Sequence, residues 1–499
     1  MIVWLFVGVV ALEIAYLRSR AFRTESALKA TSDPMGGTDR LRGGGSAAVQ
    51  HGQLMTLDPT ARFLIDSRTK KPVFITGDDA FSLQVQLSDP DIQFYLSDRA
   101  ARGFNAIWMG LADNTYSNHP PKDFYGNAPF DGAAFTNEDP AYWKRVDQTL
   151  KWAADRGITV LANPAFVGYG CKEGYCESYR SSSMETLTAY GRFLGDRYKR
   201  FPNIIWLIGG DADPRDDNVQ SKLCALAKAI KSADPVHLMT TENYRGTSSQ
   251  DIWTQASWLD LDAMYLEPTD ILTKTSAEYQ RHRRPMFMLE DWYEGEHSMT
   301  ELGVRTEGYW AVLSGCTTGR VFGNYALWDF TWTPHTDEPW KKQLDSTGSI
   351  GQSFLGKLFR SREHWKLVPD SDHTVMTAGY DSRDFFSSAW ESLRSVVRRE
   401  PYRIGGASSA AARTSDGQTI IAYVPNGNLS VITIDMSKIT DPGAKAKGWW
   451  FSPGSGSATL IGAFSANGKR SFRPPDSGDW VLVLDSEMAN LAAPGTKDL

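Results

Sequence analysis

Two carboxylate residues stand directly after apolar, β-branched segments, where buried strands are expected to end. In NIIWLIGGDADP (203–214) two glycines separate the segment from Asp211, and in PMFMLED (285–291) the apolar run ends on Glu290. A turn would also explain Gly and Asp, because both are common turn residues. The alternative is chemical: two carboxyl groups that converge can act as a proton donor and a nucleophile.

Other kinds of catalytic site have weaker support in the chain. It contains four Cys and eight His, without an HExxH motif, a CxxC pair or Cys/His ligand spacing. We therefore expect neither a metal ion nor a cofactor. The net charge is −6 and no basic run stands out, so nucleic acid is not an expected partner. The 17 Trp and 19 Tyr residues suit sugar binding, because the apolar faces of sugar rings stack on aromatic side chains.

The elements that must position the two carboxylates alternate in kind from Leu54 onward. Eight short apolar strand candidates are separated by amphipathic helix candidates. The strand candidates span residues 71–78, 104–110, 158–164, 203–210, 236–241, 261–265, 285–290 and 320–328. This alternation predicts an α/β fold, a (β/α)8 TIM barrel. A doubly wound sheet is the competing fold, but it favours a glycine-rich phosphate motif after the first strand, which TGDDAF does not supply.

After about Val375 the alternation stops, apart from a possible short helix at 385–396. Strand runs separated by Asn-Gly, Pro-Gly and Pro-Pro pairs predict a small C-terminal antiparallel β-sandwich. The Trp449-Trp450 pair could form a sugar platform, although such a pair more often divides between a sandwich core and a domain interface. The predicted regions are a signal or membrane-anchor segment (1–20), a flexible linker (21–52), the barrel (53–372) and the β-sandwich (373–499).

The apolar N-terminal segment also bears on location. It favours an exported or membrane-anchored protein in a periplasmic or extracellular setting, although Arg18, Arg20 and Arg23 after it would by the positive-inside rule place the body in the cytoplasm. Cys171 and Cys176 bracket the short loop CKEGYC and are expected to form a disulfide if the protein is exported. In the cytosol they would be thiols.

A barrel of this kind carries its active site at the carboxyl ends of its strands. Asp211 follows the fourth strand and Glu290 ends the seventh, so the two side chains can meet across the mouth of the barrel. Retaining glycoside hydrolysis needs two carboxyls about 5–5.5 Å apart, one protonated and one ionised. We therefore assign Asp211 as the acid/base and Glu290 as the nucleophile, and expect Gly209 and Gly210 to leave room for a sugar.

Further residues near strand ends are candidates for substrate binding: Asp78, Asn114, Tyr265, Trp292, Tyr293, Glu294 and Trp328. Asp78 could instead bond the barrel floor, and the aromatic residues could instead fill the core. Glu294 could orient Tyr293 or an arginine such as Arg305. Asp213, which precedes Pro214, is expected to cap the next helix.

Several separated motifs resemble the apiosidase-like glycoside hydrolases. They are NIIWLIGGDADP, PMFMLEDWYEG, VRTEGYWAVLSGCTTGRVFGNYALW and LFRSREHWKLVPD, and the tail from YVPNG to DWVLVL is similar to the family's small second domain, which carries a collagen-binding label. The resemblance covers about residues 54–485. It implies a retaining, exo-acting glycosidase with an Asp acid/base in the GGD motif and a Glu nucleophile in E-x-x-YEG, which are Asp211 and Glu290 here.

The chain departs from the family pattern at two places that line the sugar pocket. Its first-strand motif is GDDAF where the family has GDTAW, which changes Asp79 and Phe81, and Thr241-Glu242-Asn243 replaces a family-typical His after strand five. These differences put apiose as the substrate in question. The expected activity is cleavage of plant or microbial polysaccharide. The alternative is an inactive barrel that serves as a surface glycan- or matrix-binding protein.

Overall fold

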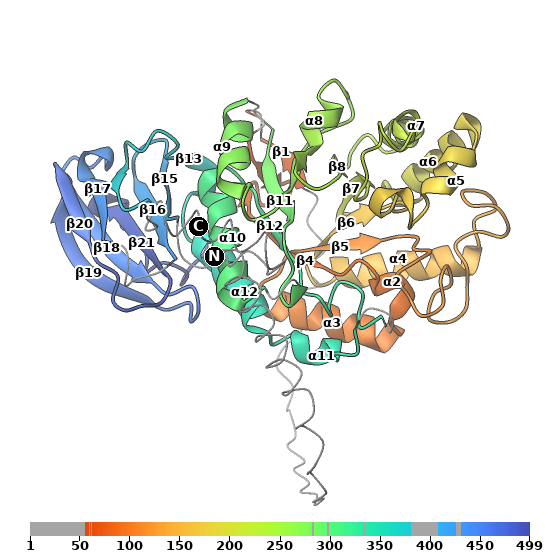
Figure 1. Ribbon diagram of the computed structural model, residues 1–499, viewed down its shortest axis with the longest axis horizontal. Coiled ribbons are helices and arrows are strands. Elements are labelled where there is room, and N and C mark those ends of the chain that lie inside the picture. Colours follow the sequence, from red (N-terminus) through yellow and green to blue (C-terminus); the bar gives the residue numbers. More distant parts are fainter. Residues whose placement is uncertain are drawn as a thin grey trace, which may run out of the picture. The chain divides into compact units, whose positions relative to one another are not determined.

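A computed structural model describes residues 55–499 except 59, 61, 282–283, 297–298, 333–335, 381–407 and 426–430 (Figure 1). The predicted anchor segment, the linker and the possible helix at 385–396 lie outside these residues, so they stay predictions. Among the described residues, no helix is long and apolar enough to cross a membrane.

Eight parallel strands form the barrel (Figure 1). They are β4 (Ile75–Asp79), β5 (Ala106–Gly110), β6 (Thr159–Asn163), β7 (Ile204–Gly209), β8 (Met239–Glu242), β10 (Asp262–Tyr265), β11 (Met286–Glu290) and β12 (Gly319–Phe322). The order β8-β7-β6-β5-β4-β12-β11-β10 follows the chain around the barrel, and the short β9 (Thr247–Ser248) pairs antiparallel with β10. The predicted fold class is confirmed.

Side chains close the seam where β8 meets β10. Ser249 Oγ donates to the carbonyl oxygen of Thr241 at 2.7 Å and accepts the backbone N–H of Ala263 at 3.0 Å. Thr240 Oγ1 donates to the carbonyl oxygen of Leu261 at 3.0 Å. Hydroxyl groups thus satisfy backbone groups that a regular strand ladder would otherwise pair.

The barrel strands are buried on both faces, which explains why they are continuous apolar runs rather than alternating ones. In β7 all six residues are buried, with Ile205 and Leu207 in the barrel interior and Trp206 and Ile208 among the surrounding helices. Burial of one such side chain contributes roughly 1.5–3 kcal/mol, so the barrel core is a large stabilising factor.

Helices follow the strands and cover the barrel (Figure 1). They are α2 (Leu83–Gln86), α3 (Asp89–Ala101), α4 (Pro140–Ala154), α5 (Cys176–Ser181), α6 (Met184–Tyr198), α7 (Gln220–Ala233), α8 (Ser249–Trp253), α9 (Ile271–Arg281), α10 (Glu301–Ser314), α11 (Trp340–Gln343) and α12 (Thr347–Arg360), with 3-10 turns η1 (Tyr169–Cys171), η3 (His364–Lys366), η4 (Met436–Lys438) and η5 (Glu487–Ala489). Ser88 and Asp139 cap α3 and α4, each with a proline in the first turn.

Two local predictions were wrong. Asp213 does not cap α7, which begins at Gln220; its carboxylate binds Arg215 at 2.8 Å instead. The eighth strand was predicted to reach Trp328 but ends at Phe322. Beyond it, Asn324 accepts the backbone N–H groups of Leu327 and Trp328 on its carbonyl oxygen, at 3.0 and 3.2 Å, so the chain turns there.

Antiparallel sheets follow the barrel. One sheet has the order β13 (Leu367–Pro369), β15 (Ala410–Thr414), β16 (Thr419–Val424), β21 (Trp480–Ser486), β18 (Lys445–Phe451) and β19 (Ala458–Ser465), and another joins β14 (Met376–Ala378), β17 (Ile432–Asp435) and β20 (Lys469–Phe472). A small sheet of β1 (Met55–Leu57), β2 (Leu64–Asp66) and β3 (Pro72–Val73), absent from the prediction, precedes the barrel. The predicted domain boundaries stay predictions.

Barrel and C-terminal sheets meet in a contact that is both apolar and ionic. Tyr309 of α10 stacks on Tyr423 of β16 with ring centroids 4.7 Å apart. Trp449 packs in the same cluster as α10 and α12, whereas Trp450 lies in the core between the sheets, so this pair divides as the sequence analysis considered. Arg362 binds Asp485 through two hydrogen bonds of 2.9 and 2.7 Å, and both side chains are buried.

The buried ion pair gives a stability prediction. Arg362→Met leaves the Asp485 carboxylate buried without its cation, and we expect a loss of about 3–5 kcal/mol in the free energy of unfolding, measured by urea denaturation. Lys366→Met is the control, because its partners Glu363 and Asp416 are partly exposed, and it should cost about 1 kcal/mol or less. Equal losses in the two variants would contradict the role assigned to Arg362.

Candidate active site

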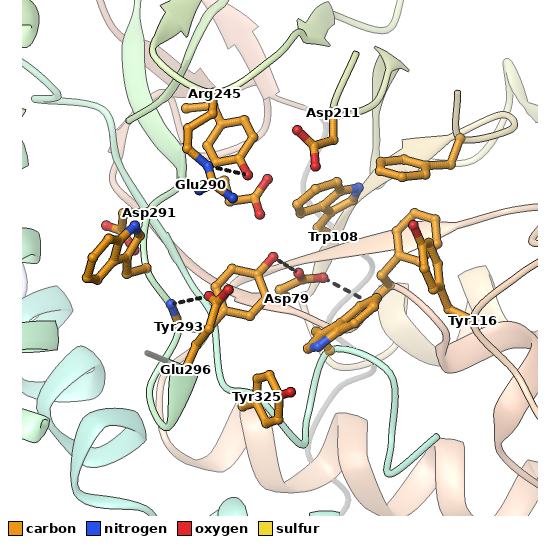
Figure 2. A pocket seen from close by; sticks show the side chains of 15 residues that line it. Asp79, Trp108, Tyr116, Asp211, Arg245, Glu290, Asp291, Tyr293, Glu296 and Tyr325 are labelled. Atoms are coloured by element: carbon orange, nitrogen blue, oxygen red, sulfur yellow. Dashed lines mark hydrogen bonds between the residues drawn. The ribbon is translucent and has the colours of Figure 1, made fainter. Parts of the chain in front are cut away.

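A cavity of about 170 Å³ opens at the carboxyl ends of the barrel strands (Figure 2). Its lining is rich in acidic and aromatic side chains and includes one arginine. The lining residues are Asp79, Phe81, Trp108, Tyr116, Phe166, Asp211, Arg245, Tyr265, Glu290, Asp291, Trp292, Tyr293, Glu296, Tyr325 and Trp328. The two predicted catalytic carboxyls, Asp211 and Glu290, point toward the same space in Figure 2.

The turn that carries Asp211 has an unusual backbone. Gly209 and Gly210 have φ of +97° and +134°, and Asp211 itself lies in the left-handed region at φ +36°. A side chain at Gly209 would meet the carbonyl oxygen of Glu242 at 2.3 Å, and one at Gly210 would meet the Phe166 ring at 2.1 Å. The glycines therefore admit this carbonyl and this ring, and not a sugar as the sequence analysis expected.

A loop between β6 and α5 supports this turn. The backbone N–H groups of Val167 and Gly168 donate to the carbonyl oxygens of Gly209 and Gly210 at 3.3 and 3.2 Å. Cys171 and Cys176 form a disulfide within the same loop. The loop thus fixes Phe166 against Gly210 and holds the backbone of Asp211, a non-glycine residue in a strained conformation.

Burial sets the ionisation of Asp211. It raises the pKa of this carboxyl to about 7; Arg245 opposes the rise, while Glu173 and Glu296 add to it. The Arg245 guanidinium is itself held by Tyr265 Oη and by Glu267 Oε1, each at 3.3 Å. Asp211 therefore keeps a proton to near neutral pH, which is the property that a general acid needs.

The structure distinguishes Glu290 from its neighbour Asp291. The Asp291 carboxylate binds Arg320 through two hydrogen bonds of 2.7 and 2.6 Å, and both side chains are buried. Glu290 is directed into the cavity, on the other side of the strand end (Figure 2). Asp291 is therefore committed to an ion pair in the barrel wall, and Glu290 is the carboxyl available to a ligand.

Glu290 is surrounded by other acids. Burial and then the nearby Glu242, Asp211 and Asp79 raise the pKa of Glu290 well above the ordinary value of a glutamate. The expectation that Glu290 stays ionised while Asp211 is protonated therefore does not hold for the free site, in which both carboxyls are biased toward the protonated form.

Asp79 is a further carboxyl of the cavity wall. Tyr293 Oη donates to its Oδ2 at 2.5 Å, and the backbone N–H of Phe81 donates to its Oδ1 at 3.0 Å. Burial raises the pKa of Asp79 to about 8, against the opposing effect of the Tyr293 hydrogen bond. At neutral pH this side chain is a neutral acid that can both donate to and accept from a hydroxyl group.

The predicted binding residues divide into two groups. Tyr265, Trp292, Tyr293 and Trp328 line the cavity, and Asp78, Asn114 and Glu294 do not. Asp78 is fully buried and accepts from Tyr95 Oη at 2.6 Å and from Arg99 at 3.4 Å, which is the alternative role that the sequence analysis considered for it.

Asn114 and Glu294 instead support neighbouring segments. The Asn114 amide donates to the carbonyl oxygen of Gly174 at 2.8 Å, within the disulfide loop. The Glu294 carboxylate accepts the backbone N–H of Gly348 at 2.8 Å and the hydroxyl of Ser346 at 2.5 Å, at the start of α12. Glu294 thus orients neither Tyr293 nor Arg305 by these contacts; Arg305 binds Asp479 at 2.9 Å.

Sequence reasoning missed part of the lining as site residues. Asp79 and Phe81 were expected to line the sugar pocket, as a departure from the family pattern, but were not chosen as site residues; both line the cavity. Arg245, Phe166, Tyr116 and Glu296 come from loops, where no periodicity or motif signals an inward direction. Only the packed barrel brings these loop side chains to the cavity.

The chain is similar to known families and solved structures. The sequence model "Apiosidase-like, catalytic domain" matches residues 58–366, more than half of the chain, and "Putative collagen-binding domain of a collagenase" matches residues 397–485. A glycoside hydrolase family 5 structure from Bacteroides vulgatus aligns with a TM-score of 0.72 at 22% identity, over 90% of this chain and 96% of its own. A second glycoside hydrolase structure aligns with a TM-score of 0.70 at 22% identity, over 88% and 97%. No curated protein matches the chain.

Because Glu290 and Asp291 differ in their partners, we expect amide substitutions at the two positions to change the stability of the protein in opposite directions. The folded protein holds a proton on Glu290 at pH values where the unfolded chain has lost it, so this group lowers stability as pH rises above the ordinary pKa of a glutamate. Glu290→Gln should therefore raise the melting temperature at pH 8 and change it less at pH 4. Asp291→Asn leaves Arg320 buried without its main anion and should cost about 3–5 kcal/mol at pH 8. Destabilisation by Glu290→Gln at pH 8 would contradict this description of the site.

Proposed function

This chain belongs to the apiosidase-like family, and we propose that it is a retaining glycoside hydrolase with Asp211 as acid/base and Glu290 as nucleophile. The observation that carries the proposal is the convergence of these two carboxyls, from the ends of β7 and β11, on one cavity at the barrel mouth. Aromatic faces surround them, as a sugar-binding wall requires.

The reaction follows from these positions. Asp211 donates its proton to the glycosidic oxygen while a Glu290 carboxylate oxygen attacks the anomeric carbon, so the bond to the leaving group breaks and a glycosyl ester forms. Asp211, now ionised, then takes a proton from a water molecule, which attacks the same carbon and releases Glu290. Two displacements return the starting configuration. Burial supports the first step, because it keeps Asp211 protonated to about pH 7.

The size of the cavity supports exo action. Its volume of about 170 Å³ is small beside the roughly 300–1,000 Å³ of sites that hold drug-sized ligands. A single sugar unit at the end of a chain fits this description better than an oligosaccharide segment. Plant or microbial polysaccharide is the proposed substrate class. Of the two departures from the family pattern, Asp79 lines the cavity and bears on which sugar is accepted, whereas Glu242 does not line it, contrary to the expectation from the sequence.

The activity is tested with a panel of nitrophenyl glycosides and plant cell-wall oligosaccharides. Turnover of a member with release of one terminal sugar, and retention of anomeric configuration by NMR, is the expected result. Absence of turnover together with measurable binding of a polysaccharide would favour an inactive, glycan-binding barrel instead.

The two carboxyl roles are separated by variants assayed on the active glycoside. Glu290→Ala should abolish turnover, because no glycosyl-enzyme can form. Asp211→Ala should lose about 10²–10⁴-fold in rate on substrates with poor leaving groups, which need the acid in the first step. On an activated nitrophenyl glycoside, where hydrolysis of the glycosyl-enzyme limits the rate, azide should partly restore turnover by replacing the water that the missing base can no longer activate. Wild-type rates in both variants would show that the assignment is wrong.

The pKa of Asp211 predicts the alkaline side of the pH profile. kcat/KM should fall as pH rises through about 7, because the acid loses its proton. Arg245→Met removes a positive charge that favours the ionised form, so the fall should move to higher pH. Arg215→Met serves as the control, because this half-exposed arginine pairs with Asp213 away from the cavity and should leave the midpoint in place. A downward shift in Arg245→Met would contradict the assignment of this limb to Asp211.

A further inference from the structure

We propose that Glu242 is a positioning residue of this site, which shares one proton with Glu290 through a carboxyl–carboxyl hydrogen bond while its Oε1 holds the backbone of Asp211. The inference rests on the proposed function and adds a third carboxyl to it. Glu242 ends β8, is 3% exposed and does not line the cavity, so it acts through the two residues that do.

Backbone and side chain of Glu242 both hold the turn that carries Asp211. Its Oε1 accepts the backbone N–H of Asp211 at 3.1 Å, and its carbonyl oxygen accepts the backbone N–H of Gly210 at 3.2 Å. Gly209 pairs with Glu242 in the β7–β8 ladder. These contacts fix the strained backbone of Asp211 from the side opposite the disulfide loop, which binds Gly209 and Gly210 through their carbonyl oxygens.

The second oxygen of this carboxyl group, Oε2, is buried and receives no hydrogen bond from a donor among the described residues, and the Glu290 carboxyl lies within hydrogen-bonding reach of Glu242. Two carboxylates offer only acceptors, so such a bond exists only when one of the two groups carries a proton. Glu242 is buried and Glu290 is half-buried. The charge of Glu242 raises the pKa of Glu290, whereas the hydrogen bond with Glu290 lowers the pKa of Glu242. The pair therefore has a singly ionised state that an O–H···O⁻ bond stabilises, and a second ionisation that the like charge opposes.

Other charged and titratable groups around Glu242 and Glu290 do not make the second ionisation of this pair easier. Asp211 after β7 and Asp79 in β4 add negative charge only as pH rises through their pKa values of about 7 and about 8, and the hydroxyls of Tyr265 in β10 and Tyr293 after β11 are neutral. Arg245 acts on Asp211. Among these carboxyl groups, Glu242 and Glu290 are the pair joined by a side-chain hydrogen bond.

The shared proton resolves the difficulty that Glu290 faces as a nucleophile. Transfer of its proton to the adjacent Glu242 oxygen leaves Glu290 ionised and Glu242 neutral, with no change in the number of protons in the site. Neutral Glu242 then donates a hydrogen bond to the Glu290 carboxylate. The nucleophile becomes available in a buried cavity without the cost of a second negative charge.

The first test uses the wild-type protein and no substrate. Glutamate labelled with ¹³C at the side-chain carboxyl is followed by NMR through a pH titration, and Glu290 is assigned with Glu290→Gln. A shared proton predicts two separated steps at Glu290, one in the ordinary carboxyl range and one well above it. A single step at Glu290 in the folded wild type would overturn the proposal.

The second test compares two isosteric variants. Glu242→Gln keeps an acceptor for the Asp211 N–H but cannot share a carboxyl proton, so Glu290 should titrate in one intermediate step. The acid limb of kcat/KM on the active glycoside should move up by about one pH unit, because a neutral amide bond stabilises the Glu290 anion less than the carboxyl bond does. An unmoved limb, or a downward shift from simple loss of a like charge, would overturn the proposal.

Glu278→Gln is the matched control. Glu278 is hydrogen-bonded to Asp262 in another carboxyl pair, which lies outside the cavity lining. This variant should change the unfolding free energy without moving the acid limb or the Glu290 titration. An equal movement in both variants would mean a general loss of structure rather than a shared proton, and would overturn the proposal.

Glycosidase activity and proton sharing by Glu242 are decided by separate measurements. If the glycoside panel shows no turnover, the proposed function fails while the NMR titration still decides whether Glu242 and Glu290 share a proton. If Glu290→Ala is inactive but Glu242→Gln has the wild-type titration and pH profile, the glycosidase assignment stands and Glu242 only supports the backbone.

Discussion

The cavity depends on the desolvation of several carboxyl groups held within reach of one another. Asp79, Asp211, Glu242 and Glu290 come from four different strands and meet where little water can solvate their charges. Burial raises the pKa of each, and each added charge makes the next ionisation harder. Only some of these acids can therefore be ionised at the same time. The acids that stay protonated include one that can donate a proton in catalysis.

Three other buried acids, one of them in the cavity lining, are paired with arginine. Asp291 pairs with Arg320, Asp485 with Arg362, and Asp78 with Arg99, so each has a guanidinium beside it. These pairs fix the barrel wall and the contact with the C-terminal sheet, and they do not need to change charge. In the cavity lining Arg245 is the lone arginine, and Tyr265 and Glu267 also engage it. The contrast separates acids that support the fold from acids that can exchange protons.

The acid-bearing turn shows how the fold accepts a strained residue. Asp211 occupies a left-handed backbone conformation that non-glycine residues seldom adopt. Two neighbours stabilise it: the Glu242 side chain and backbone on one side, and the disulfide-containing loop with Phe166 on the other. Placement of the acid thus depends on segments that are distant in the sequence, and the two glycines before it are required for their close approach.

The order of strands and helices could be predicted from the sequence, because the barrel is built from local patterns: apolar runs of strand length, capped helices and turn residues. Those patterns also placed Asp211 and Glu290 at strand ends, on opposite sides of one barrel mouth. They could not show which of Glu290 and Asp291 is free to meet a ligand, or that Asp78 and Asn114 lie outside the cavity lining. Residues near a strand end differ in the direction of their side chains, and a local pattern does not give this direction. Tertiary packing decided that Arg320 takes Asp291, that loops bring Arg245 and Phe166 inward, and that Glu242 reaches both catalytic candidates. Direction and proximity are properties of the closed barrel, which no local pattern encodes.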